Sequence, residues 1–166
     1  MQKYMKQIII LILAIFLGAC SYSVHSNSFP HLKTIVILPF TNSTTEYNLE
    51  EDLLNELSNL FINDGRLKIV SISPDCQLEG EILDYTDKIY TYDSSTIDAY
   101  QVKILFKIIF TDLKKNSIIW QNNSLILSET YSETDESSEF ASVAEAQKEI
   151  MKDLYDTIIK NSLEEW

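Results

Sequence analysis

The sequence predicts an α+β fold: a two-layer sandwich in which two helices pack on one face of a mixed, four- to five-stranded sheet. Apolar residues recur at steps of three and four in two segments, at about 48–63 and 139–163, as in helices buried on one side. Runs that are rich in β-branched residues, or that alternate between apolar and polar residues, fill most of the chain between residues 34 and 131. The predicted order is β-α-β-β-β-β-α, or one strand fewer.

The first strand is expected over residues 34–40, Thr-Ile-Val-Ile-Leu-Pro-Phe. This run is almost purely apolar, which is typical of a strand in the centre of a sheet. Pro39 lacks a backbone N–H and is expected to end the strand's hydrogen-bond ladder. Residues 67–70 form the second strand, which is expected to run parallel to the first because a helix crosses over between them.

The crossover helix is expected at about 48–63. Asn48 is placed as its N-cap, with Glu51 three residues on in an approximate capping box. Gly65 is expected to stop the helix in a left-handed conformation. The apolar stripe of this helix consists of Leu49, Leu53, Leu54, Leu57, Leu60 and Phe61.

The chain after residue 77 is expected to form β structure. A long strand covers 78–90, and a turn follows at 92–96. The strand at 100–111 has apolar residues at every even position and mostly polar ones at odd positions. This period of two places one face on the core and leaves the other at least partly in water. A tight turn at 114–116 leads into its hairpin partner, 117–131.

The last helix is expected at about 139–163, after a polar and acidic loop. Its two faces differ clearly in polarity. The buried stripe is predicted to consist of Phe140, Val143, Ala144, Ile150, Leu154 and Ile158. The solvent-exposed face is predicted to carry Glu145, Lys148, Glu149, Lys152 and Asp153.

The first twenty residues have the three parts of an export signal: a basic start, an apolar run from Ile8 to Phe16, and small residues before Cys20. The apolar run is well below the ~20 residues needed to span a bilayer. The ending Leu-Gly-Ala-Cys resembles the lipobox of bacterial lipoproteins, which implies cleavage before Cys20 and a diacylglyceryl group on its thiol. The alternative is an ordinary secretory signal that happens to end in cysteine.

These features divide the chain into a signal peptide (1–19), a lipidated tether (20–33) and one domain (34–166). Ser21, rather than aspartate, follows the cysteine. By resemblance to enterobacterial sorting rules, this residue favours the outer membrane over the inner one.

Composition excludes some classes of partner. Removing the 19-residue leader from 166 residues leaves 147, about the size of one domain. Eleven Lys and Arg then stand against 25 Asp and Glu, a net charge of −14 that argues against nucleic-acid binding. Cys76 is the only cysteine besides Cys20, so no intrachain disulfide is expected. We interpret Cys76 as a small buried hydrophobe.

The sequence lacks a catalytic constellation. His25 and His31 both lie in the predicted tether, and the acidic run Glu50–Asp52 is explained by a helix N-terminus. Gly65 and Gly80 are the only glycines after the leader, which excludes a phosphate-cradling loop. Two histidines and one thiol do not make a metal site. The sequence therefore predicts a binding or structural protein, not an enzyme, with no metal and no cofactor beyond the covalent lipid.

Five segments occur in an order that is shared with one known family. They are His31–Thr45, Asp64–Val70, Leu78–Ile82, Ala99–Ile104 and Asp112–Trp120. Together with the lipobox and the acidic closing helix that ends in Trp166, they resemble the lipopolysaccharide-assembly lipoproteins of the LptE family. The resemblance covers nearly the whole chain, and the shared order of the segments carries it.

The resemblance implies an outer-membrane lipoprotein that faces the periplasm. Members of the family plug the β-barrel LptD, help that barrel assemble and bind lipopolysaccharide. The implied fold, two helices over a four-stranded sheet, agrees with the fold predicted from the residues. Because lipopolysaccharide is anionic and the 92–98 turn carries two aspartates, the candidate binding residues are Lys103, Lys107, Lys114 and Lys115. The alternative is that these lysines only keep the sheet soluble.

Two other functions are alternatives. A regulatory lipoprotein that activates a cell-wall synthase shares a similar first strand, but a long Pro- and Gln-rich tether would be expected. About a dozen residues separate Cys20 from the first strand here, and they span at most ~40 Å. A secretion-channel subunit of the curli type would need membrane-inserting segments that the sequence lacks after Phe16.

Overall fold

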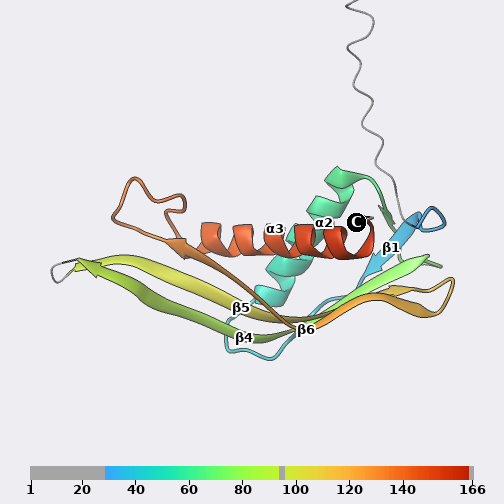
Figure 1. The fold of residues 1–166 in the computed structure, drawn as a ribbon, viewed down its shortest axis with the longest axis horizontal. Helices are drawn as coiled ribbons and strands as arrows, with labels where there is room; N and C mark the ends of the chain where they lie inside the picture. The colour runs from blue at the N-terminus through green and yellow to red at the C-terminus, as the bar shows by residue number, and fades with distance from the viewer. Residues whose placement is uncertain (1–28, 94–95, 165–166) are drawn as a thin grey trace, which may run out of the picture.

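The computed structural model describes residues 29–93 and 96–164, which form two helices and one sheet. Figure 1 shows both helices on the same side of the sheet. The predicted fold class is confirmed, and the sheet has six strands. The elements are β1 (Thr34–Ile37), β2 (Thr41–Asn42), α2 (Leu49–Asp64), β3 (Lys68–Ile69), β4 (Cys76–Asp93), β5 (Thr96–Asp112), β6 (Ser117–Tyr131) and α3 (Val143–Ser162).

The sheet is mixed, with the strand order β3-β1-β4-β5-β6 and with β2 also paired to β4. β1 runs parallel to β3, as the crossover helix predicts, and also parallel to β4. The long strands β4, β5 and β6 pair antiparallel through their hairpins. β4 extends to Asp93 and β5 begins at Thr96. Both strands of this hairpin therefore continue further than the expected strands, 78–90 and 100–111.

The core lies between the helices and one face of the sheet. The even positions of β5 point into it, as the alternation predicts: Val102, Ile104, Phe106, Ile108 and Phe110 are fully or almost fully buried. From the helices the core receives the side chains Leu49, Leu53, Leu57, Phe61, Ala146, Ile150, Met151, Leu154, Tyr155, Ile158 and Ile159. Cys76 is completely buried, which confirms its interpretation as a small hydrophobic residue.

Two details of the helix predictions were wrong. Asn48 precedes α2 in a left-handed conformation (φ 61°) and its side chain makes no capping hydrogen bond. Its carbonyl oxygen instead accepts the N–H groups of Glu51 and Asp52. In α3, Ala144 is exposed and Ala146 lies in the core instead. Ala146 continues the row of Ile150, Leu154 and Ile158 at steps of four, whereas Ala144 lies off that row.

The N-terminus of α3 is held by a capping box. The Ser142 hydroxyl accepts the N–H of Glu145 at 3.3 Å, and the Glu145 carboxylate accepts the N–H of Ala141 at 2.8 Å. This reciprocal pair satisfies two backbone donors that would otherwise lack partners. It also explains why the helix begins at Val143.

A break in the edge of the sheet separates β1 from β2. Pro39 cannot continue the ladder, and the chain crosses there to place Phe40 on the core side of β4. The Phe40 ring lies directly over Gly80: a Cβ atom at Gly80 would be 2.4 Å from the Phe40 Cε1 atom and 2.5 Å from the Lys107 carbonyl oxygen. Glycine is therefore required at this position by close approach and not by its backbone angles.

Candidate functional site

The candidate functional site is the face of the sheet that points away from the helices, which we call the outer face. No segment among the described residues forms a second layer over it (Figure 1). On β5 the outer face carries the odd positions, of which Lys103 is exposed and Leu105, Lys107 and Ile109 are half-buried. A protein that leaves one face of an antiparallel sheet bare normally makes that face polar.

The outer face is only partly polar. Leu105 of β5 stands directly opposite Ile126 of β6, and Thr111 stands opposite Ile118. Ile126 is 57% exposed and Ile118 is 55% exposed. Exposed isoleucines are ordinary when single, but a set of apolar residues on one sheet face is typical of an interaction surface. The apolar members of the face are Val36, Leu38, Leu105, Ile109, Ile118 and Ile126.

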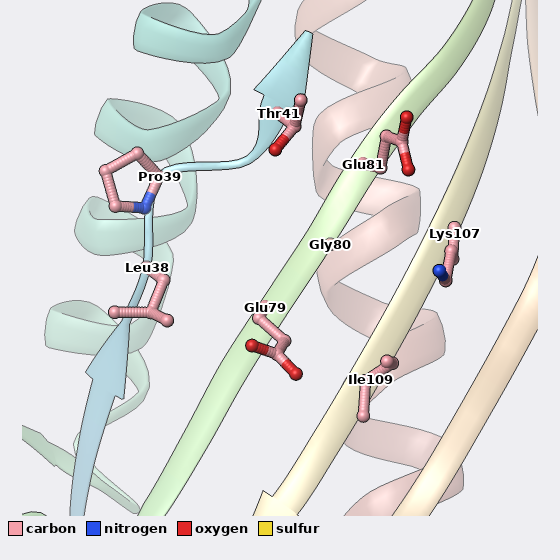
Figure 2. Close-up of a pocket in the computed structure, with 8 residues that line it drawn as sticks. All are labelled: Leu38, Pro39, Thr41, Glu79, Gly80, Glu81, Lys107 and Ile109. Atoms are coloured by element: carbon pink, nitrogen blue, oxygen red, sulfur yellow. The ribbon is translucent and has the colours of Figure 1, made fainter. Parts of the chain in front are cut away.

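A hollow of about 320 Å³ opens on the outer face where β1 breaks. Figure 2 shows its lining, with the helices behind the strands: Leu38, Pro39, Thr41, Glu79, Gly80, Glu81, Lys107 and Ile109. Glu81 is the cross-strand partner of Lys107, and its carboxylate accepts the Ser43 hydroxyl at 2.6 Å. Two carboxylates beside one lysine make this hollow a poor site for an anion such as a lipid phosphate.

The four candidate lysines do not gather at one site. Lys103 and Lys107 lie on the outer face of β5, four residues and therefore ~13 Å apart. Lys114 and Lys115 lie in the turn between β5 and β6, beyond the end of the strand. The Lys114 ammonium pairs with a carboxylate oxygen of Asp75 at 3.1 Å. Lys103 and Lys115 are exposed and have no acidic partner within ion-pair distance in the described part of the chain.

Two aspartates that no sequence motif indicates as functional tie the first described residues to the sheet. One carboxylate oxygen of Asp75 accepts the N–H groups of Lys33 and Thr34, at 2.9 and 3.0 Å. Asp112, which is fully buried, accepts a hydrogen bond from His31 Nε2 at 2.6 Å and from the Lys115 N–H at 2.9 Å. Each aspartate lies at or next to the end of a strand. That position is the only feature of the sequence from which its role could have been predicted.

Electrostatics agree with this geometry. The N–H of Lys33, followed by the Lys114 ammonium, lowers the pKa of Asp75 to about 2. Burial opposes ionisation of Asp112, but the hydrogen bonds from His31 and Lys115 outweigh it and hold its pKa below the usual range. Burial, with the charges of the same two aspartates, raises the pKa of the Cys76 thiol to about 12, so this cysteine is unreactive at neutral pH.

Residues 32–161 match the family model described as LptE, lipopolysaccharide-assembly. The chain belongs to the LptE family. The match begins at the buried Leu32 and ends in the last turn of α3, so it takes in both helices and the whole sheet. Among curated proteins none matches the chain. The LptE family is a family of lipopolysaccharide-assembly proteins, not of enzymes.

Solved structures of low sequence identity share this LptE-like fold. The hypothetical protein CT253 from Chlamydia trachomatis is 11% identical, with a TM-score of 0.58 over 79% of this chain and 98% of that one. The protein XCC0632 from Xanthomonas campestris is 10% identical, with a TM-score of 0.55 over 80% of this chain and 85% of that one. At such identities the likeness shows the fold alone.

Residues 29–93 and 96–164 contain no group of three or more His, Cys, Asp or Glu side chains that could hold a metal ion. Neither helix of the described chain is long and apolar enough to cross a membrane. Cys20, the predicted site of lipid attachment, lies outside the described residues, as does His25.

Proposed function

We propose that this protein is an outer-membrane lipoprotein, anchored on the periplasmic side by lipid on Cys20, that plugs an LptD-type β-barrel. In this role it helps the barrel assemble and assists the insertion of lipopolysaccharide at the cell surface. Membership of the LptE family supports the proposal. The main structural support for the plug role is the outer face of the sheet, which no described segment covers and which carries exposed isoleucines.

The composition of the outer face suits the inside of a barrel. The lumen of an outer-membrane barrel is polar, and a plug therefore needs a surface that mixes polar contacts with a few apolar anchors. Glu79, Glu81, Lys103 and Lys107 supply charges of both signs. Covering the exposed halves of Ile118 and Ile126 contributes ~1 kcal/mol for each side chain.

Contact with lipopolysaccharide is a separate part of the proposal. Its phosphates need cationic partners, and Lys103 and Lys115 are the two candidates that are exposed and form no ion pair within the described chain. Lys107 faces Glu81, and Lys114 pairs with Asp75. Because Lys103 and the turn at residues 113–116 lie ~30 Å apart along β5, one lipid A headgroup cannot reach both.

The test is purification of the tagged, lipidated protein from detergent-solubilised outer membrane, followed by mass spectrometry of what remains bound. The proposal predicts a stoichiometric LptD-type β-barrel. Recovery of a peptidoglycan synthase without any barrel would refute the plug role and favour the regulatory lipoprotein. Mass analysis of the N-terminal peptide tests the anchor separately, because a free thiol at Cys20 would contradict lipidation.

A further inference from the structure

The basic residues of the domain are not spread evenly, and one end of the molecule carries an unusual share of them. Figure 1 shows the start of the described chain, the beginning of β1 and the β5–β6 turn together at one end. The β4–β5 hairpin and the loop before α3 extend toward the opposite end. We call the first of these the basic end and define it by Lys33, Lys68, Ile72, Leu113, Lys114 and Lys115.

Backbone hydrogen bonds hold the segments of the basic end side by side. The Lys68 N–H donates to the Lys33 carbonyl oxygen at 2.9 Å, which joins β3 to the residues before β1. The Leu113 N–H donates to the Asp75 carbonyl oxygen at 2.9 Å, which joins the β5–β6 turn to the loop before β4. The Asp75 carboxylate links both pairs, because it accepts the Lys33 N–H and contacts the Lys114 ammonium.

This end is cationic in a protein that is otherwise strongly acidic. The three segments that form it, residues 29–36, 67–76 and 111–119, contain four lysines and two acids, whereas the whole chain has a net charge of −12. All four lysines are exposed. Both acids, Asp75 and Asp112, are buried and bound to neighbouring donors. Lys114 pairs with Asp75, and Arg66 beside this end pairs with Asp64 and Glu164. Lys33, Lys68 and Lys115 are therefore the exposed cations of this end that have no acidic partner within ion-pair distance among the described residues.

Apolar side chains project among these lysines. Ile72 is 85% exposed and lies in the loop between β3 and β4. Leu113, in the turn beside Lys114, is 38% exposed. Lysines around exposed aliphatic residues are the combination that binds the headgroup layer of an anionic bilayer.

The length of chain before the domain places a bilayer close to this end. Nine residues lead from Cys20 to Phe29, and they reach at most ~32 Å. The chain enters the domain at the basic end, because His31 bonds to Asp112 there and the Lys33 N–H donates to Asp75. A lipid on Cys20 would therefore hold the basic end, and not the hairpin end, against the membrane that carries it.

We propose that the basic end is a bilayer-docking surface, in which Lys33, Lys68 and Lys115 contact anionic phospholipid headgroups while Ile72 and Leu113 enter the headgroup layer. This inference rests on the lipid anchor proposed above. Docking would orient the domain on the leaflet that holds Cys20 before it enters a barrel, with the long hairpin pointing away from that leaflet. The occupant is the lipid surface itself and not lipopolysaccharide.

The test uses the full mature, lipidated protein in vesicles of phosphatidylethanolamine and phosphatidylglycerol at about 3:1, without lipopolysaccharide. A polarity-sensitive dye is placed on Ile72→Cys, since Cys76 is buried and does not compete for the label. Quenching by doxyl lipids should be several-fold stronger in these vesicles than in neutral ones, and 0.5 M salt should abolish the difference. The same dye on Ser137→Cys, in the loop before α3, should not be quenched.

Charge variants supply the matched comparison. Lys33→Gln, Lys68→Gln and Lys115→Gln together should lower the ratio of docked to undocked domains about 100-fold, at roughly fivefold for each lysine. Lys88→Gln, Lys148→Gln and Lys152→Gln together remove the same charge elsewhere and should leave docking unchanged. A lipidated protein whose dye at position 72 stays in water in anionic vesicles would overturn this inference alone. Absence of lipid on Cys20 would overturn both this inference and the anchor.

Discussion

Replacing Gly80 by alanine tests the packing that creates the break between β1 and β2. A Cβ atom at this position would be 2.4 Å from Phe40 Cε1 and 2.5 Å from the Lys107 carbonyl oxygen. Both distances are about 1 Å shorter than a normal contact, and the second atom belongs to the backbone of the neighbouring strand. The Phe40 ring can turn aside only by leaving a buried site, and the carbonyl can move only by disturbing the β4–β5 ladder.

We therefore expect Gly80→Ala to lower the free energy of unfolding by ~3 kcal/mol, at the upper end of the range for overpacked cores. For a domain of this size the melting temperature should fall by roughly 6–12 °C. Urea unfolding followed by circular dichroism measures the change, and the slope of the transition should stay the same because the surface exposed on unfolding does not change.

Gly65 provides a matched control. It ends α2 at φ 72°, and no atom lies within 4 Å of a Cβ built there. Gly65→Ala should therefore cost only the ~1 kcal/mol of a left-handed alanine. If Gly80→Ala destabilises the protein by less than Gly65→Ala does, the close packing of Phe40 on Gly80 is not what holds this part of the sheet.

Three further predictions concern the cap, the buried aspartate and the outer face. Ser142→Ala should cost ~1 kcal/mol in urea unfolding, because it removes the acceptor for the Glu145 N–H; an unchanged midpoint would contradict the capping box. The folded-state pKa of Asp75, about 2, lies below its unfolded value, so its stabilising contribution is complete above about pH 5 and is lost as the pH falls toward 2. Asp75→Asn should make the free energy of unfolding depend less steeply on pH in this range. An equally steep dependence in the variant would show that Asp75 is not its cause. Ile126→Glu should change the unfolding free energy by less than ~0.5 kcal/mol, yet should markedly reduce barrel recovery in the pull-down, whereas full recovery would exclude Ile126 from the contact.

Regular elements of the fold could be predicted because their residues repeat with one period. The alternation in β5 identified its buried face, and the leucine stripe located α2 to within one residue at each end. The parallel pairing of β1 and β3 followed from the helix that connects them. These features depend on neighbours in sequence, which a single chain displays directly.

Contacts between distant residues could not be predicted in the same way. Nothing near Gly80 in the sequence indicates that Phe40 will lie over it, and the pairing of His31 with Asp112 joins residues 81 positions apart. Asn48 is a favourable N-cap by residue type, but its backbone takes a left-handed conformation and its side chain makes no capping hydrogen bond. The candidate lysines were chosen from local charge, and only the sheet register shows Lys107 opposite Glu81.

The measurement that tests the central claim most directly is site-specific photo-crosslinking in intact cells. A benzophenone amino acid is placed at Ile126 on the outer face or, as control, at Lys148 on the exposed side of α3. If the outer face lies against a barrel wall, the probe at position 126 should give a crosslink to an LptD-type β-barrel, much stronger than the one from position 148. Crosslinks to the barrel from position 148 alone would contradict the assignment of the outer face, and none from either position would contradict the plug role.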